Sequence, residues 1–192
     1  SRCANIGKKS QEAFKALSKA FERNTSLTSL SLHETNMNTE SGARIIMALA
    51  NNPNLQFLDI GSNALEPDIV PTIAEFLSRS SGVGLSTLIL KKNLLGLGIR
   101  ALCDGLRENN TVAILDIEEN EVGNDGVKQI ADLLLTNTTL TNINLRNNFI
   151  TQTGIINLFS ALKKNNTLRN LNVSKNKVLD EGAKEIASTL EK

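Results

Sequence analysis

The stretch Leu140-Thr-Asn-Ile-Asn-Leu-Arg-Asn-Asn-Phe-Ile150 follows the pattern L-x-x-L-x-L-x-x-N-x-L, and the chain repeats this pattern six times. The copies start 28, 30, 27, 28 and 28 residues apart, at Leu27, Leu55, Leu85, Val112, Leu140 and Leu168. Self-similarity at a nearly fixed period is typical of a solenoid, in which each repeat contacts only its neighbours. The sequence therefore predicts one repeat domain whose fold is set by this pattern.

Each repeat has a strand half and a helix half. In the fifth copy Ile143-Asn-Leu145 alternates apolar and polar residues, which indicates a short half-buried strand. Leu158, Ala161 and Leu162 then recur at helical spacing and predict one apolar helix face. A helix is about 10 Å wide and strands lie about 4.8 Å apart, so the stack must curve. We expect an α/β solenoid, a horseshoe with six parallel strands on the concave face and about seven helices on the convex face.

The boundaries of the domain follow from where the repeat pattern begins. Residues 1–9 do not fit the strand pattern, and we interpret them as a lead-in or as the remnant of a preceding repeat. Ser10 is a candidate N-cap for a helix from about Gln11 to Arg23 that covers the first strand. We expect the repeat domain to comprise residues 10–192, with this half-repeat helix and six repeats starting near residues 27, 55, 85, 112, 140 and 168.

Most copies carry an asparagine at the ninth position, where the chain leaves the strand. These residues are Asn63, Asn93, Asn120, Asn148 and Asn176, with Thr35 in the first copy. An inward-facing amide supplies both a donor and an acceptor to backbone groups that the turn leaves unpaired. We expect a structural ladder, and the alternative of a polar binding stripe is disfavoured by the buried register of these positions.

Composition excludes several classes of function. The chain has 192 residues and a net charge of +1, so nothing predicts a nucleic-acid or membrane surface. There is no apolar run of transmembrane length and no secretory signal. The two cysteines, Cys3 and Cys103, fit a reducing compartment better than an oxidising one. We expect a cytoplasmic, intracellular protein.

The repeat resembles the ribonuclease-inhibitor-like class of leucine-rich repeat proteins. The resemblance rests on the period near 28, on asparagines in the closing turns (Asn109, Asn137 and Asn165), and on the pairs Gly98-Ile99, Gly126-Val127, Gly154-Ile155 and Gly182-Ala183. It covers residues 11–192 and implies an intracellular, protein-binding horseshoe. The class includes the activator of the Ran GTPase, sensor domains of NOD-like receptors and tropomodulin-like actin cappers. Ribonuclease inhibitor itself is rich in cysteine, tryptophan and tyrosine, whereas this chain has neither Trp nor Tyr, which argues against that specific activity.

No catalytic constellation, metal-ligand cluster or phosphate-binding loop is present in the sequence. Cys103 is a possible nucleophile, but the only histidine, His33, lies two repeats away, roughly 10 Å at the spacing of parallel strands. We therefore expect a non-enzymatic protein that uses no cofactor and no metal.

The concave wall is then the candidate binding surface. Phe57, Ile89 and Ile114 are apolar at positions expected to face solvent on three consecutive strands. A contiguous exposed apolar cluster marks a contact site, although single exposed hydrophobic residues are ordinary. Nearby residues of alternating charge predict a cross-strand ion ladder or the charged rim of a binding site. The predicted protein-binding surface comprises Phe57, Asp59, Ile89, Lys91, Ile114, Asp116, Glu118, Asn144 and Arg146.

We expect a monomeric interaction scaffold that binds another protein on this face, with no nucleic-acid and no membrane partner. Two alternatives stay open: a GTPase-activating protein resembling the Ran activator, and the recognition part of a larger sensor, actin-regulating or effector protein. The polar insertion Ser78–Gly84 is a second candidate contact site or a tolerated loop.

Overall fold

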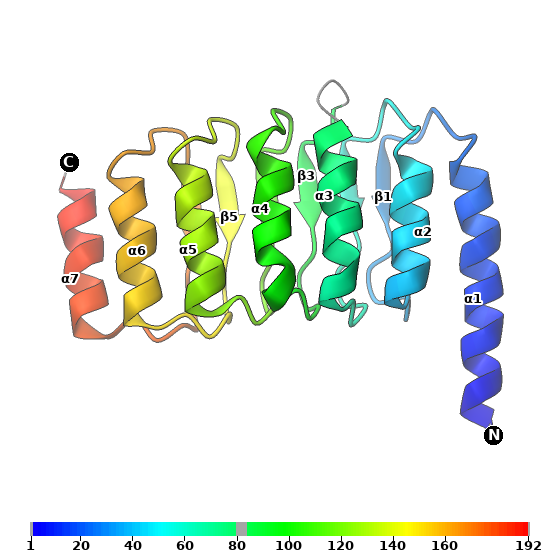
Figure 1. The fold of residues 1–192 in the computed structure, drawn as a ribbon, viewed down its shortest axis with the longest axis horizontal. Coiled ribbons are helices and arrows are strands. Elements are labelled where there is room, and N and C mark those ends of the chain that lie inside the picture. The colour runs from blue at the N-terminus through cyan, green and yellow to red at the C-terminus, as the bar shows by residue number, and fades with distance from the viewer. Residues whose placement is uncertain (1, 80–83, 192) are drawn as a thin grey trace.

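The computed structural model describes the backbone of residues 2–79 and 84–191 and the side chains of residues 11–79 and 84–191. Within these residues, helices and strands alternate along a solenoid (Figure 1). The helices are α1 (Arg2–Phe21), α2 (Thr39–Leu49), α3 (Val70–Arg79), α4 (Ile99–Arg107), α5 (Gly123–Leu134), α6 (Gln152–Leu162) and α7 (Leu179–Leu190). The strands are β1 (Ser29–Ser31), β2 (Phe57–Asp59), β3 (Thr87–Ile89), β4 (Ile114–Asp116), β5 (Asn142–Asn144) and β6 (Asn170–Asn172).

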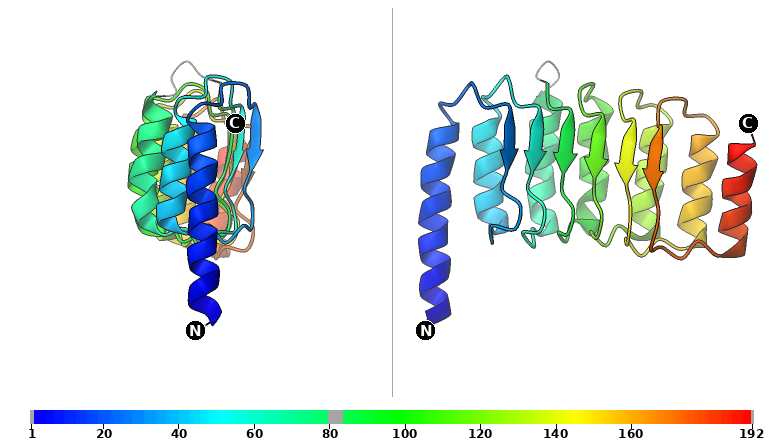
Figure 2. Two further views of the ribbon diagram at one scale, coloured as in Figure 1. Left: turned by 90° about the vertical axis from the view of Figure 1, so that its right-hand side faces the viewer. Right: turned by 180° about the vertical axis from the view of Figure 1, so that it is seen from behind.

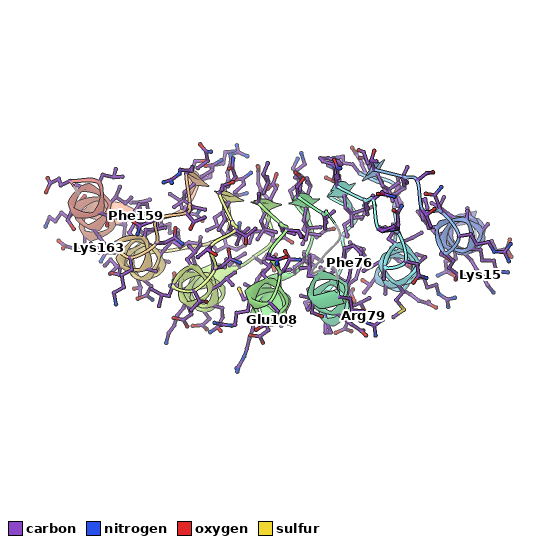
Figure 3. All side chains as sticks on the ribbon, turned by 90° about the horizontal axis from the view of Figure 1, so that it is seen from above. Lys15, Phe76, Arg79, Glu108, Phe159 and Lys163 are labelled. Carbon is purple, nitrogen blue, oxygen red and sulfur yellow. The ribbon has the colours of Figure 1, made fainter. Side chains whose placement is uncertain are left out.

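The strands form one parallel sheet in the order β1-β2-β3-β4-β5-β6, as the repeat pattern predicted. All strands line one side of the molecule and all helices the other (Figure 2). Seen from above, the helices form the outer arc and the strands the inner one, so the sheet is the concave face (Figure 3). Hydrogen bonds between repeats continue past the strands, for example from Glu34 N–H to Gly61 O at 3.0 Å. This pairing holds the residues that follow each strand in register as well.

Helix α1 begins at Arg2, so the prediction of a helix start near Gln11 is wrong, and Ser10 lies inside the helix instead of capping it. Residues 2–10 contain no proline and one glycine, which costs about 1 kcal/mol in a helix and does not by itself end it. The division between residues 9 and 10 as a domain boundary stays a prediction.

The two repeats of unusual length enter their helices through short 3-10 turns, Pro67–Ile69 and Gly96–Gly98. Proline is tolerated at the first position of such a turn because its missing N–H would have no partner there. Gly98 is required for packing, since a Cβ at this position would lie 2.5 Å from Cγ2 of Val70 in the preceding repeat. The sheet register is unchanged across both repeats.

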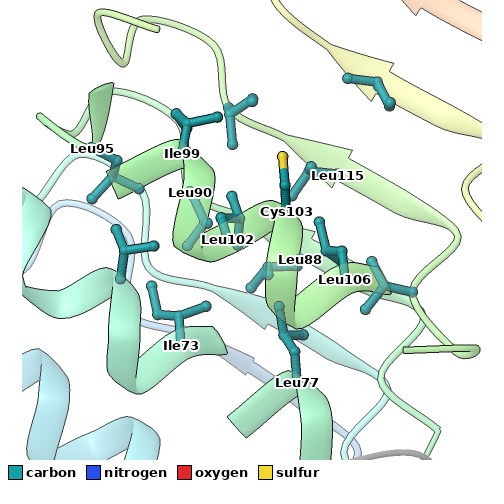
Figure 4. Close-up of a cluster of buried hydrophobic side chains, with 14 of the residues drawn as sticks. Ile73, Leu77, Leu88, Leu90, Leu95, Ile99, Leu102, Cys103, Leu106 and Leu115 are labelled. Carbon is teal, nitrogen blue, oxygen red and sulfur yellow. The ribbon is translucent and has the colours of Figure 1, made fainter. Parts of the chain in front are cut away.

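One continuous hydrophobic core lies between the sheet and the helices. Its sheet side is a row of in-register residues that are almost fully buried, Leu58, Leu88, Leu115 and Ile143. Its helix side is made of one apolar stripe per helix, and Figure 4 shows the part around Cys103, Leu102 and Leu106. Because each repeat buries its apolar residues against its neighbours, the core supports the concave face along the length of the sheet.

The ninth-position asparagines form the predicted ladder. Oδ1 of Asn63 accepts the N–H groups of Thr35 at 3.0 Å and Met37 at 3.1 Å in the preceding repeat, and Nδ2 donates to Leu32 O at 2.8 Å. The later members are connected in the same way, although Asn120 accepts a bond from Leu95 alone among the described residues. The ladder amides are buried or half-buried and are engaged in hydrogen bonds with the backbone, which supports the structural interpretation of these residues.

A second ladder joins the turns that lead from helix to strand. Nδ2 of Asn137 donates to Leu106 O at 3.0 Å, and its Oδ1 accepts the N–H groups of Thr139 and Leu140 at 2.9 Å and 2.8 Å. Asn109 and Asn165 make the corresponding bonds in their own turns. These asparagines belong to N-x-S/T sequons, and their amide nitrogens are already engaged in the fold, which supports a role in turn geometry.

Candidate functional site

The concave face consists of the strand residues that alternate with the buried core residues. In β2, β3 and β5 the central residue is buried and its two neighbours are half-buried, and in β4 the first residue is exposed. Successive side chains of a strand point to opposite faces, so these flanking residues point away from the helices. The structure places all nine residues of the predicted surface on β2–β5 or directly after these strands.

The three apolar residues lie on adjacent strands but in two different rows of the sheet. Phe57 and Ile114 occupy one row and are both paired with Thr87 of the strand between them. Ile89 lies in the next row, between Asp59 and Asp116. Ile114 is 38% exposed, whereas Phe57 and Ile89 are half-buried. The residues are therefore brought together as a partly covered apolar triangle, which is less exposed than the sequence suggested.

The polar residues of the second row also have a structural task that the sequence analysis missed. Oδ1 of Asp59 accepts the N–H of Gly61 at 2.9 Å, and Oδ1 of Asp116 accepts the N–H of Glu118 at 3.0 Å. Such turns, closed by the side chain of Asp or Asn, mark the point where the chain leaves a strand. The available signal was the recurrence of Asp or Asn at the same position of four repeats.

The predicted row of alternating charges forms only in part. The carboxylate of Glu118 pairs with the guanidinium of Arg146, and it accepts a hydrogen bond from Nδ2 of Asn144 at 3.0 Å. Arg146 also lies 3.8 Å from a carboxylate oxygen of Glu119. Lys91 has no ion pair among the described residues, although its charge acts on the neighbouring carboxylates. The cross-strand ladder thus spans β4 and β5 and does not extend to β3.

Two carboxyl groups of this face have shifted pKa values. Burial tends to raise the pKa of Glu118, but hydrogen bonds from Asn144 and Arg146 and the positive charges of Arg146 and Lys91 outweigh it and lower the pKa. The pKa of Asp116 is raised, first by burial and also by the nearby charge of Glu118. The two carboxyl groups therefore differ in environment. Hydrogen bonds and positive charges compensate the burial of Glu118, whereas they do not fully compensate the burial of Asp116.

Cys103 does not lie in the environment of a catalytic nucleophile. Its side chain is 2% exposed, and burial raises the pKa of the thiol to about 12, so the thiolate that would act as a nucleophile is suppressed. Among the described residues no group of three or more His, Cys, Asp or Glu side chains is arranged to hold a metal ion. In the same part of the chain no helix is long and apolar enough to cross a membrane. The alternative contact segment Ser78–Gly84 falls mostly on residues 80–83, outside the described residues.

Comparisons with known proteins also identify leucine-rich repeats in this chain. A family model described as "Leucine Rich repeat" matches residues 51–74, 108–131 and 164–187. A Caenorhabditis elegans protein described as "Protein phosphatase 1 regulatory subunit 37 homolog" is 34% identical over 112 residues, which is 58% of this chain. The match spans only 12% of the length of that relative.

Two solved structures share the fold at low sequence identity. The first is described as leiomodin-1 actin-binding site 2, with a TM-score of 0.52 at 16% identity over 93% of this chain and 87% of the other. The second is the tropomodulin C-terminal domain of Caenorhabditis elegans, with a TM-score of 0.52 at 12% identity over 93% of this chain and 91% of the other. With its repeat period, one parallel sheet and asparagine ladder, the chain has the leucine-rich repeat fold, and three of its segments match the leucine-rich repeat family model.

Proposed function

We propose that this domain is a non-enzymatic scaffold that binds another protein on its concave face. The observation that carries the proposal is the apolar triangle of Phe57, Ile89 and Ile114, which lies beside the Glu118–Arg146 ion pair on adjacent strands. Apolar side chains pointing away from the core contribute little to the fold, and a dry centre with a charged rim is the usual arrangement of a protein interface.

The shape of the surface supports the same function. The face is concave and built on a sheet whose backbone is paired along its length, so its side chains are held by rigid elements. Rigid side chains lose little conformational freedom on binding, which favours affinity. Solenoids present extended concave surfaces of this kind to their partners.

The names of the relatives give two candidate settings for the partner. The protein phosphatase 1 regulatory subunit homologue matches at 34% identity over 112 residues, whereas the actin-associated structures match at 16% and 12% and carry the fold alone. The sequence likeness therefore favours a role in regulating protein phosphatase 1 over a role on actin.

The test is a capture experiment with the wild-type chain and the double variant Phe57→Ala/Ile114→Ala. Purified protein phosphatase 1 catalytic subunit, monomeric actin and a lysate of the native source serve as three separate inputs. We expect at least one protein to be retained by the wild type and lost with the double variant, because truncation removes the apolar centre of the interface. The thermal stability of the variant should change little, since both side chains point away from the core.

Three results would count against concave-face binding. The first is retention of the same proteins by both chains, which would move the site to the rim or the convex face. The second is unfolding of the double variant, which would place Phe57 and Ile114 in the core. The third is failure of the wild type to retain any protein from the three inputs.

A further inference from the structure

One row of the concave face has a residue from every strand in register. Its members are Ser31, Asp59, Ile89, Asp116, Asn144 and Asn172. Asp or Asn occupies four of these positions, and each accepts the N–H two residues later at 2.9–3.1 Å. Asn144 and Asn172 make this bond as neutral amides, so the turn requires an acceptor but no charge.

The aspartates of the row carry a charge that this structural task does not use. An asparagine at Asp116 would keep the bond to Glu118 N–H and would not place a carboxylate in a half-buried position, where burial raises its pKa. In the described residues no lysine or arginine lies within ion-pairing distance of Asp59 or Asp116. Asp59 lies beside His33, at 3.4 Å between Nδ1 and Oδ1, which is a cation only when protonated, and its Oδ2 accepts a hydrogen bond from the Ser31 hydroxyl at 3.5 Å. A side-chain hydrogen bond from Asn144 and the charge of Lys91 tend to lower the pKa of Asp116, but burial outweighs them. Both carboxylates therefore have hydrogen-bond partners within the domain but no lysine or arginine ion pair among the described residues, which leaves room for a cation from outside.

Ile89 interrupts the row between the two aspartates. An Asp or Asn at this position would accept the N–H of Lys91, as the row does on the neighbouring strands. With isoleucine there, the Lys91 N–H has no hydrogen-bond partner among the described residues. The turn after β3 therefore lacks this side-chain hydrogen bond, and a half-buried apolar side chain occupies the position of the acceptor.

We propose that Asp59, Ile89 and Asp116 form a socket for an arginine or lysine side chain of a protein partner. The partner presents this side chain from a basic, extended segment that lies across the concave face, so the inference rests on the proposed function. Ile89 is the apolar floor for the aliphatic stem, and the carboxylates that flank it on β2 and β4 receive the charged head. Long basic side chains combine such a stem and head, and their bonds to carboxylates are among the stronger hydrogen bonds in proteins.

The surroundings extend the socket in two directions. Phe57 and Ile114 lie in the adjoining row, so an apolar residue of the partner beside the basic one has a surface to contact. The free N–H of Lys91 is a donor for a carbonyl of the partner backbone. The expected recognition element is therefore a basic residue next to an apolar residue.

The experiment is a selection of phage-displayed random linear peptides on the wild-type chain. We expect enrichment of peptides in which Arg or Lys neighbours an apolar residue. The double variant Asp59→Asn/Asp116→Asn should bind these peptides at least about ten-fold more weakly, because the charge-assisted bonds are lost. Its melting temperature should be unchanged or higher, since asparagine retains the bonds to Gly61 and Glu118.

Ile89→Asn is the matched variant that changes the apolar residue of the socket instead of its charges. It restores the missing acceptor for Lys91 N–H and should raise the melting temperature by about 2–4 °C. It also removes the floor of the socket and should weaken peptide binding as strongly as the loss of the two charges. A variant that is both more stable and deficient in binding cannot be explained by unfolding.

The outcomes separate this inference from the proposed function. Absence of enrichment, enrichment of peptides without Arg or Lys, or full-strength binding by Asp59→Asn/Asp116→Asn overturns the socket. A lower melting temperature of that variant also overturns it, because the charges would then serve the fold. If selected peptides without a basic residue still depend on Phe57 and Ile114, the concave-face function stands. Peptides that bind equally well to Phe57→Ala/Ile114→Ala and to Asp59→Asn/Asp116→Asn would contradict both.

Discussion

Oδ1 of Asn148 accepts the backbone N–H of Asn120 at 2.8 Å, so the amide of one repeat completes the turn of the repeat before it. It also accepts the N–H of Val122 at 3.3 Å, and its Nδ2 donates to Ile117 O at 2.9 Å. A change in one ladder residue is therefore felt in the preceding repeat. This is a physical basis for the nearest-neighbour coupling expected of a solenoid.

Asn148→Ala should lower the free energy of unfolding by about 1–3 kcal/mol, because buried N–H groups at Asn120 and Val122 lose their acceptor. Urea unfolding followed by circular dichroism measures the loss. The control is Asn176→Ala, which removes the equivalent bonds in the last repeat, where the amide is only half-buried. Water can replace part of the bonding there, so its loss should be smaller. Equal losses in both variants would contradict the importance of burial.

Phe149 is an aromatic residue with a left-handed backbone (φ 58) and a 65% exposed side chain. Bulky residues are disfavoured in this conformation, and asparagine tolerates it. We expect Phe149→Asn to raise the free energy of unfolding by about 0.5–1 kcal/mol. Leu135→Asn is the control, since Leu135 is also exposed but has an ordinary helical backbone (φ −67), and it should give no gain. A stability loss in Phe149→Asn would show that the ring makes contacts that outweigh the backbone preference.

The repeat pattern predicted most of the fold because the same spacing of apolar strand and helix residues recurs in each of the six repeats. Leu58, Leu88, Leu115 and Ile143 are buried in one row, as an alternating strand pattern requires. The prediction for α1 was wrong because a possible cap residue does not end a run whose other residues all tolerate a helix.

The candidate site was less predictable because its geometry depends on cross-strand neighbours. The repeat register identified Phe57, Ile89 and Ile114 as outward-facing and also placed Ile89 between Asp59 and Asp116, as the strand pairing confirms. It also predicted charge pairing along a row that includes Lys91, whereas the described ion pairs join β4 to β5. Side-chain direction in a curved sheet decided these contacts, and spacing in the sequence does not encode it.

Glu118 and Asp116 should respond to acid in opposite directions. The folded-state pKa of Glu118 is lowered, so its contribution to stability is present above its unfolded pKa and is lost as the pH falls through the folded one. The folded-state pKa of Asp116 is raised, so its contribution is present below its unfolded pKa and is lost as the pH rises. Glu118→Gln should therefore flatten the loss of stability on acidification, and Asp116→Asn should steepen it.

Urea titrations at a series of values from about pH 7 to about pH 3 cover the titration of both carboxyl groups. The comparison is the slope of unfolding free energy against pH in the two variants and in the wild type. The same slope in all three chains would show that neither group changes its proton affinity on folding.

Cys103 should react with thiol reagents only when the domain unfolds. Its side chain is 2% exposed and packs in the core shown in Figure 4, and burial raises the pKa of the thiol to about 12. Alkylation requires the thiolate, which is nearly absent at neutral pH in the folded chain. A Cys3→Ser variant isolates the signal from Cys103. Its labelling by iodoacetamide should be slow in buffer and should accelerate in parallel with the unfolded fraction as urea is added.

The raised pKa of the Cys103 thiol also affects the stability of the domain at alkaline pH. A folded-state pKa above the unfolded value of about 9 means that the contribution of this thiol to stability is present below pH 9 and is lost as the pH rises towards 12. Wild-type stability should therefore fall through this range more steeply than that of Cys103→Ala, measured by urea unfolding of the two chains side by side. Native-state labelling of Cys103 as fast as that of free glutathione would contradict both expectations, because it would require an accessible thiol with an ordinary pKa.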